Sequence, residues 1–407
     1  MAKQLQDFQS YPMDFNTPIP PDFVRGKTIL LTGGASGFGA RFFSRWASQG
    51  ATVIIGDINA AAGTALVARV REETKNPNLH FLPLDVTSWP SQVEFFREAV
   101  KLSPHGGIDT VVANAGINKP DESRAFETPT IDYQTHPNPP APSLATIDVN
   151  LTGTLYTVHL ALSYLPKNPG STRCSANPNP SSEVAERDRH ILLLGSIAGM
   201  IPLPSQIPYC ISKHGVMGLF RTLRTTVPIS LGIRVNMLCP YFVDTPILGT
   251  PGKVLLSGVA LADIEHVIDA GSRFVADPRC VGRSVAIAPK LRVRSPLSGS
   301  GDGTGEERIP GMGGTSGVPD EADIYDLTPA GKEGGVQREV RDIAIWEVYV
   351  HDVDEMEMFG RRMVSVFLVA TRIRGWVMFV VDLMTGFGEI LRKMCGDDGK
   401  GKGKKEC

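Results

Sequence analysis

The chain has 407 residues, 42% of them hydrophobic, which is enough to bury the core of one large α/β domain with additions. Its 41 basic and 43 acidic residues nearly balance, so charge gives no reason to expect a nucleic-acid partner. The six cysteines lack the close pairing of a zinc site, and the polar, proline-rich N-terminus lacks a signal-peptide core, so we expect no metal and a cytoplasmic protein, with attachment to a membrane surface left open.

From Lys27 onward, short β-branched apolar runs alternate with longer stretches of helical periodicity, which is typical of βαβ units around a parallel sheet. The predicted fold class is α/β, a Rossmann-type doubly wound parallel sheet with helices on both faces and a helical C-terminal extension. A helix is predicted over 37–49. The predicted strands are 28–32, 52–55, 79–84, 110–113, 191–194, 234–238 and 283–287.

Two stretches rich in Pro, Asn, Ser and Thr, 118–142 and 168–189, interrupt this order and are expected to be surface insertions. After the last predicted strand, 295–317 is dense in Gly, Ser and Pro and is expected to be a linker. The predicted organisation is an N-terminal extension (1–26), a Rossmann-fold catalytic domain (27–290), a linker (291–339), a helical extension (340–394) and a tail (395–407).

The helical extension contains a strongly apolar portion, 364–384. Arg372 and Arg374 fall near its middle, and each costs about 2.5 to 3.5 kcal/mol at the centre of a bilayer. A single membrane span is therefore disfavoured. The sequence leaves open a helix docked on the domain, on a second subunit or on a membrane surface.

A glycine-rich turn, Thr32–Gly39, follows the first predicted strand and opens the first helix. Glycine lets the chain turn tightly and lets backbone N–H groups approach a pyrophosphate at the helix N-terminus, where the helix dipole favours negative charge. The spacing, with glycines at 33, 37 and 39, differs from the GxGxxG of long-chain dinucleotide folds. Taken alone, the turn fits a purely structural role equally well.

Asp57 ends the second strand, where a carboxylate can accept hydrogen bonds from the adenosine ribose hydroxyls and would repel a 2′-phosphate. No Lys or Arg lies between Gly33 and Gly39 to neutralise such a phosphate. Both observations favour NAD over NADP. The alternative is that Asp57 is an ordinary turn residue at a strand end.

Tyr209 and Lys213 are four residues apart, so on a helix they share one face, and Ser196 ends the strand before it. A phenol titrates near 10, so a base at neutral pH needs a shift of roughly three units, which Lys213 and a positive nicotinamide ring could supply. Ser196 can hold the substrate oxygen against Tyr209. A Tyr and Lys at this spacing alone would more often be an exposed helix face.

Over Lys27–Pro246 the chain resembles the short-chain dehydrogenase/reductase family, whose motifs occur here in the family's order: the glycine-rich turn Thr32–Gly39, Asp85, Asn114–Gly116, Asn150, Ser196, and Tyr209 with Lys213. Within it, the chain is most similar to the fungal branch near 15-hydroxyprostaglandin and 5′-hydroxyaverantin dehydrogenases. The resemblance implies that Asn150 holds a relay water, that Lys213 also holds the nicotinamide ribose, that Thr245 meets the carboxamide, and that the protein is a homo-oligomer. The catalytic residues it implies are Asn150, Ser196, Tyr209 and Lys213. The cofactor-binding residues expected from the motifs and the resemblance are Gly33, Ser36, Gly37, Phe38, Gly39, Asp57, Asp85, Val86, Asn114, Ala115, Gly116, Tyr209, Lys213, Val243 and Thr245.

One departure is Tyr241, where the family usually has glycine; it places a bulky ring near the nicotinamide or the substrate entrance. His214 and Cys210, beside the catalytic residues, are interpreted as structural. We expect an NAD-dependent oxidoreductase that interconverts a secondary alcohol and a ketone of a hydrophobic small molecule, acting as a dehydrogenase. The alternatives are a membrane-associated ketone reductase and a non-catalytic NAD-binding scaffold.

Overall fold

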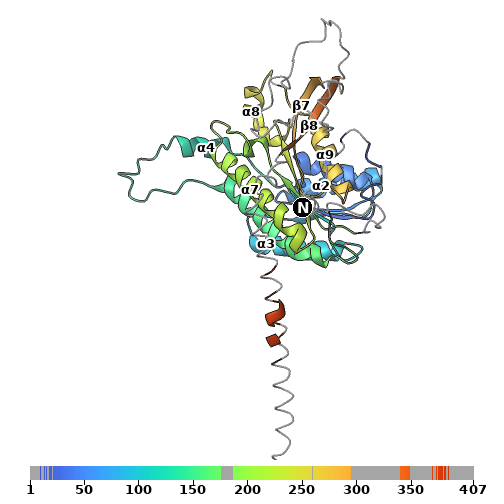
Figure 1. Ribbon diagram of the computed structural model, residues 1–407. Helices are drawn as coiled ribbons and strands as arrows, with labels where there is room; N and C mark the ends of the chain where they lie inside the picture. The colour runs from blue at the N-terminus through green and yellow to red at the C-terminus, as the bar shows by residue number, and fades with distance from the viewer. Residues whose placement is uncertain are drawn as a thin grey trace, which may run out of the picture. The chain divides into compact units, whose positions relative to one another are not determined.

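The computed structural model describes residues 10, 13, 15, 18–20, 22–175, 187–258, 260–294 and 340–348, and single positions between 369 and 384. The chain divides into two compact units, Met1–Val350 and His351–Cys407. The first unit holds the sheet and the helices that pack on it (Figure 1).

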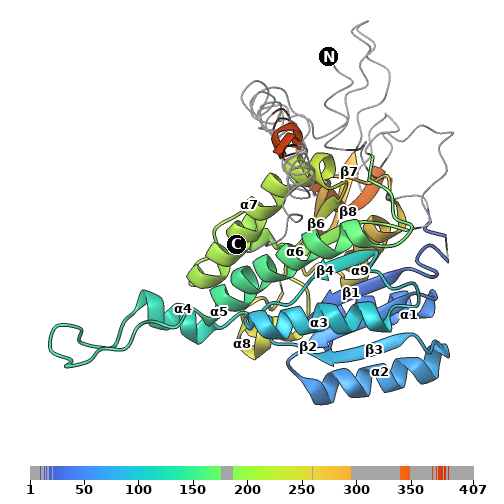
Figure 2. The ribbon, with the colours of Figure 1, turned by 90° about the horizontal axis from the view of Figure 1, so that it is seen from below.

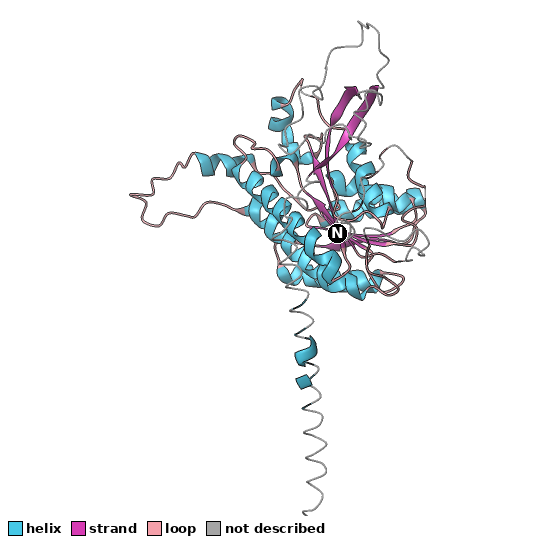
Figure 3. Cartoon of the chain, viewed as in Figure 1, coloured by secondary structure: helices cyan, strands magenta, loops and turns pink. Residues whose placement is uncertain are grey.

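Within the described residues, the first unit is built on an eight-stranded sheet of order β3-β2-β1-β4-β5-β6-β7-β8. Its strands are drawn in magenta in Figure 3. All pairings from β3 to β7 are parallel, and β8 pairs with β7 antiparallel. The strand order reverses between β1 and β4, so the crevice at their carboxyl ends is where an open α/β sheet binds its ligand. The strands are β1 (Thr28–Thr32), β2 (Thr52–Asp57), β3 (Leu79–Pro83), β4 (Thr110–Ala113), β5 (His190–Leu194), β6 (Arg234–Pro240), β7 (Ser284–Arg294) and β8 (Val340–Val348).

Helices cover both faces of the sheet (Figure 2). One face packs against α1 (Gly37–Ser48), α2 (Ala60–Thr74) and α9 (Ile264–Ala276). The other packs against α3 (Trp89–Leu102), α6 (Gly153–Tyr164) and α7 (Ile207–Ser230). The shorter elements are α4 (Pro120–Glu127), α5 (Ala145–Ile147), the π-helix η2 (Asp148–Thr152), α8 (Gly249–Leu255) and the 3-10 helices η3 (Leu165–Lys167), η4 (Ile197–Gly199) and η5 (Pro246–Leu248).

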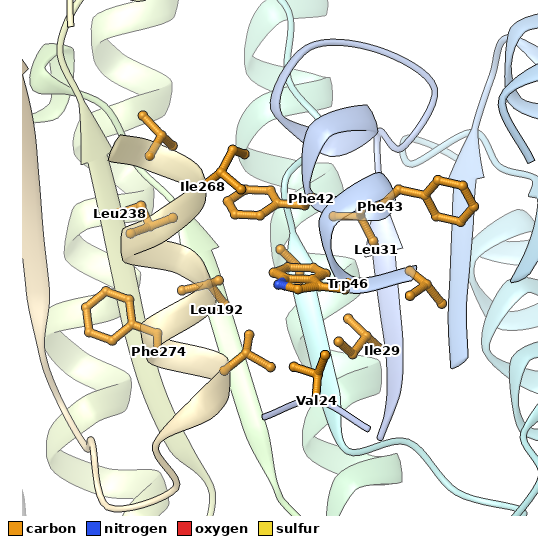
Figure 4. Close-up of a cluster of buried hydrophobic side chains, with 14 of the residues drawn as sticks. Val24, Ile29, Leu31, Phe42, Phe43, Trp46, Leu192, Leu238, Ile268 and Phe274 are labelled. Atoms are coloured by element: carbon orange, nitrogen blue, oxygen red, sulfur yellow. The ribbon is translucent and has the colours of Figure 1, made fainter. Parts of the chain in front are cut away.

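The core on the first face is centred on Trp46 of α1, which is fully buried (Figure 4). Its ring stacks on Phe42 at 4.7 Å, and its Nε1 donates to Ser272 Oγ of α9 at 3.1 Å. A Cβ at Gly271 would lie 2.5 Å from the Phe42 ring, so α9 can approach α1 only because that residue is glycine. This packing fixes the helix whose N-terminus the glycine-rich turn opens.

The two predicted insertions have different outcomes. Residues 118–142 include the helix α4, and the loop after it is exposed, as expected (Figure 2). Residues 176–186 of the second insertion lie outside the described part of the chain, and its ends meet in a bridge between Ser171 and Arg187.

The prediction of a helix from residue 340 is wrong at its start, because Val340–Val348 forms the strand β8. The boundary expected at 290 also falls inside a strand, since β7 runs to Arg294. The physical reason is the pairing of the two segments: the edge of β7 gains a ladder of backbone hydrogen bonds when β8 adds to it. A buried ion pair between Arg283 and Glu347, 3.0 Å apart, ties β8 to the start of β7.

In the second unit, the described positions between 369 and 384 are helical, as predicted for this part of the extension. Their apolar side chains are exposed, among them Trp376 at 71% and Met384 at 72%. In the described part of the chain, no helix has the length and apolar character needed to cross a bilayer. Of the predicted linker, 291–339, residues 295–339 lie outside the described part of the chain, and so does the tail.

Candidate active site

The glycines of the turn after β1 meet different demands. Gly33 has a φ of +66°, and a Cβ there would lie 2.7 Å from the Ala115 Cα. A Cβ at Gly39 would lie 2.1 Å from the Gly33 oxygen, so both positions exclude a side chain. Gly37 has a φ of +52°, and a Cβ there would meet open space. Gly33 and Gly39 therefore build the turn, while Gly37 leaves open space beside it.

The N-terminus of α1 is free to meet an anion. Ser36 is the N-cap residue, and its side chain makes no capping hydrogen bond. The first turn of α1, which contains Gly37 and Phe38, has no acidic residue. Phe38 packs partly against the core of the first face, which anchors the turn from below. Backbone N–H groups and the helix dipole here suit a phosphate.

Asp57, at the end of β2, is held beside this turn. One carboxylate oxygen accepts from the Ala35 N–H at 3.0 Å, and the other accepts from the Asn59 N–H at 2.9 Å. Each carboxylate oxygen keeps lone pairs for a further donor. The structure thus brings Asp57 to the glycine-rich turn, where the sequence analysis expected it.

The loop after β3 presents Asp85 and Val86. Asp85 Oδ1 accepts from the Thr87 N–H at 2.9 Å and from its hydroxyl at 2.7 Å, so this carboxylate organises its own turn. The Val86 carbonyl accepts from the side chain of Gln92 at 2.8 Å. Gln92 is fully buried and also reaches the Gly153 carbonyl at 2.8 Å, so it joins this loop to α6. The sequence analysis did not single out Gln92, because its partners are distant in the chain.

The segment Asn114–Gly116 after β4 supports the glycine-rich turn. The Asn114 side chain donates to the carbonyls of Thr32 and Gly33 at 3.0 and 2.9 Å. The Ala115 N–H donates to the Thr32 hydroxyl at 3.1 Å. The ends of β1 and β4 are therefore locked together at the switch point of the sheet.

The four predicted catalytic residues lie close together at the carboxyl ends of β4 and β5. Ser196 follows β5, and its hydroxyl lies close enough to Tyr209, near the start of α7, to affect the pKa of the phenol. Lys213 Nζ lies 5.8 Å from the centre of the Tyr209 ring and donates to the Leu194 carbonyl at 3.0 Å. A Cβ at Gly116 would lie 3.8 Å from that Nζ and 3.4 Å from Asn150 Oδ1. Asn150, on η2, thus completes the group.

Burial is the largest cause of the pKa shifts of Tyr209 and Lys213 in the protein alone. Burial raises the pKa of Tyr209, against the opposing effect of the nearby Ser196 hydroxyl. Burial lowers the pKa of Lys213 to about 8. Lys213 is not among the groups that shift the pKa of Tyr209 in the protein alone, and a combined effect of Lys213 and a positive nicotinamide ring stays a prediction.

The residues after β6 lie beside the core on the first face of the sheet, the one centred on Trp46. Thr245 is buried, and its hydroxyl donates to the Val243 carbonyl at 3.4 Å. Tyr241 packs edge-on against Phe242 at 4.8 Å and against the first core, so its ring is partly buried.

Two neighbours of the catalytic residues make only local contacts in the described structure. His214 Nδ1 lies 2.9 Å from the Cys210 carbonyl one turn earlier in α7. The Cys210 thiol donates weakly to the Leu203 carbonyl at 3.8 Å. These contacts fit the structural roles expected for both.

Comparison with known proteins places this arrangement in a family. The model of the family described as short chain dehydrogenase matches residues 27–175 and 180–253. A 5′-hydroxyaverantin dehydrogenase of Dothistroma septosporum is 34% identical over 288 residues, which is 68% of this chain and 88% of the relative.

Two further relatives differ in the cofactor that they are named for. An NADP-dependent dehydrogenase M3 of a Phoma species is 29% identical over 67% of this chain and 78% of its own. The NAD(+) 15-hydroxyprostaglandin dehydrogenase of Mus musculus is 30% identical over 55% of this chain and 70% of its own.

Among solved structures, levodione reductase superposes with a TM-score of 0.51 at 20% identity, covering 65% of this chain and 96% of the reductase, which shows the shared fold. The match of the family model extends over more than half of the chain, and the first of these relatives is covered over most of its length. This protein therefore belongs to the short-chain dehydrogenase family of oxidoreductases.

Proposed function

We propose that the protein oxidises a secondary alcohol of a hydrophobic small molecule to the ketone, with NAD as the hydride acceptor. The observation that carries the proposal is the grouping of Ser196, Tyr209, Lys213 and Asn150 at the switch point of the sheet, beside the glycine-rich turn. A protein that only bound a nucleotide would need the turn and not the four side chains.

The residues present fit a nicotinamide dinucleotide. The open space above Gly37 and the uncapped N-terminus of α1 suit its pyrophosphate, and Asp57 suits the ribose hydroxyls at the end of β2. The Asp57 carboxylate would repel a 2′-phosphate, which supports NAD over NADP. When bound, the oxidised nicotinamide supplies a positively charged ring that accepts a hydride.

The chain's own residues would move the proton. Tyr209 Oη takes the hydroxyl proton of the alcohol as the carbon–hydrogen bond gives up its electron pair, so the products are a ketone, NADH and a proton. The Ser196 hydroxyl donates to the substrate oxygen and holds it against Tyr209. Lys213 and Asn150 return the proton to solvent. Thr245 and Val243 lie after β6, where they would meet the carboxamide.

Exposed apolar side chains beside the site support a hydrophobic substrate. Ile201, after η4, is 42% exposed, and Ile247, in η5, is 36% exposed. The two relatives named as 5′-hydroxyaverantin and 15-hydroxyprostaglandin dehydrogenases are named for hydroxyl groups of small organic molecules, which supports the same class.

The test is NADH production by the full chain over a panel of hydrophobic secondary alcohols, with NAD and NADP in parallel. We expect turnover with NAD on some members of the panel. Turnover only of ketones with NADH would reverse the proposed direction. Binding of NAD without turnover of any alcohol or ketone would show a non-catalytic nucleotide-binding protein.

We also propose that the second unit makes contact with a membrane surface, because its described helical positions expose Val369, Ile373, Trp376 and Val380 together. On a helix these spacings place the four residues on one face. Co-sedimentation with anionic vesicles tests the contact: the full chain should sediment, and Trp376→Asp should weaken it at least fivefold. Equal partitioning of both proteins would contradict it.

A further inference from the structure

The buried hydroxyl of Ser212 connects the catalytic helix to Asn150. Ser212 lies on α7 between Tyr209 and Lys213 and is fully buried. Its Oγ donates to the Tyr209 carbonyl at 2.7 Å and accepts from Asn150 Nδ2 at 3.2 Å. The Ser212 hydroxyl therefore links α7, which carries Tyr209 and Lys213, to the π-helix η2.

Both N–H groups of the Asn150 amide have acceptors once this bond is counted. Its Oδ1 accepts from the Ile117 N–H at 2.8 Å, and its Nδ2 donates to the Ile117 carbonyl at 2.9 Å. An amide side chain offers two N–H groups, so Ser212 is the partner of the second one. Without Ser212, a buried N–H would lose its acceptor, and the amide would be held from one side only.

The orientation of Asn150 matters because of what lies next to it. A Cβ at Gly116 would be 3.4 Å from Asn150 Oδ1 and 3.8 Å from Lys213 Nζ, so the amide and the ammonium both lie close to this glycine. The Asn150 carbonyl also accepts from the Thr154 hydroxyl at 2.8 Å. Small rotations of Asn150 would change the route by which a proton leaves Lys213.

We propose that Ser212 is a positioning residue for proton release, because it fixes the Asn150 amide against the loop after β4 and beside Lys213. This inference rests on the proposed function. The proposed mechanism thereby gains Ser212, a side chain that touches neither substrate nor cofactor and acts only through Asn150. Loss of Ser212 should therefore slow the proton-transfer step and leave NAD binding unchanged.

The first test is a double-mutant cycle on kcat in the full-length enzyme with NAD. Ser212→Ala should lower kcat about tenfold, as expected for one lost hydrogen bond to a catalytic group, and should increase the solvent isotope effect while leaving the KM for NAD within twofold. Ser212→Thr keeps the hydroxyl and should recover most of the rate. In the Asn150→Ala background, Ser212→Ala should cause no further loss.

Thr225→Ala is the matched control. Thr225 lies on the same helix, is buried, and donates to the Thr222 carbonyl at 2.9 Å, the same backward bond that Ser212 makes. This control should leave kcat unchanged. Equal losses from Thr225→Ala and Ser212→Ala, independent losses in the double mutant, or a rise in the KM for NAD alone would each overturn the proposal.

A second readout does not depend on turnover. The Ile117 backbone N–H donates a hydrogen bond to Asn150 Oδ1. Its hydrogen should exchange with solvent at least fivefold faster in Ser212→Ala than in wild type or Thr225→Ala. Unchanged exchange would overturn the positioning role. A wild-type protein that turns over no alcohol or ketone would instead sink the proposed function, and the exchange measurement would still decide whether Ser212 holds Asn150.

Discussion

At the scale of single residues, the site depends on groups whose titration is shifted by burial. Burial raises the pKa of Tyr209 and lowers that of Lys213 to about 8, so the protein alone keeps the phenol protonated near neutral pH. In the proposed function, the positive charge of the bound cofactor lowers the pKa of Tyr209 so that it can act as a base. In our account, the acid/base residue is therefore switched on by NAD binding.

Asp57 is the residue on which the cofactor preference depends. Asp57→Asn keeps the acceptor for the Ala35 N–H but removes the charge that would repel a 2′-phosphate. We expect the ratio of kcat/KM for NAD to that for NADP to fall at least tenfold, measured with one alcohol and both cofactors. Asp85→Asn, in the neighbouring loop, is the control. An unchanged ratio in Asp57→Asn would show that other residues select the cofactor.

The sequence allowed most of the site to be predicted, because its residues lie at strand ends in a fixed chain order. Gly33, Gly37, Gly39 and Asp57 lie together as expected. Ser212 and Gln92 were missed, since their importance comes from hydrogen bonds to residues distant in the chain. No local pattern marks a buried hydroxyl or amide that joins two elements.

At the scale of elements, apolar strands flanked by glycine and polar turns were predictable from β1 to β6, because buried parallel strands are continuous apolar runs. The strand β8 was not. It mixes Arg341, Asp342 and Glu347 with apolar residues, and only its pairing with β7 makes it a strand. Tertiary pairing of this kind leaves little trace in local composition.

The strand β5 begins at His190, which predicts how stability depends on pH. His190 is fully buried, and burial, followed by the nearby Arg234, lowers its pKa well below the usual value of 6.5. The unfolded chain takes up a proton below 6.5 and the folded protein does not, so this histidine makes the free energy of unfolding fall as pH drops through that value. The slope for one group is at most about 1.4 kcal/mol per pH unit.

Urea unfolding at pH 7 and pH 5 measures this effect. His190→Gln should reduce the loss of stability between the two pH values relative to wild type, because its side chain does not titrate. His136→Gln, at an exposed position, should leave the loss unchanged. The same pH dependence in wild type and His190→Gln would assign the acid sensitivity to other groups.

At the scale of the whole molecule, the strands β7 and β8, which follow the residues matched by the family model, are part of the first unit. Glu347 of β8 pairs with Arg283 and accepts from the Met13 N–H at 3.2 Å, so one side chain joins β7, β8 and the N-terminal segment. The chain beyond residue 294 therefore returns to the sheet.

Glu347→Gln tests this integration. It removes a charge from a pair whose side chains are only 5% and 15% exposed, and we expect a loss of about 3 kcal/mol in the free energy of unfolding. Glu73→Gln breaks the exposed pair of Arg69 and Glu73 and should cost no more than about 1 kcal/mol. Similar small losses in chemical denaturation would indicate that β8 contributes little to the fold.

The central claim is that Tyr209 is the acid/base of an NAD-dependent alcohol dehydrogenase, and the most direct measurement is NADH formation by Tyr209→Phe on an alcohol that the wild type oxidises. Tyr133→Phe, in the exposed loop after α4, is the matched control. We predict a loss of about 10²–10⁴-fold in kcat for Tyr209→Phe, with NAD binding retained and the control unchanged. Full activity of Tyr209→Phe would contradict the account.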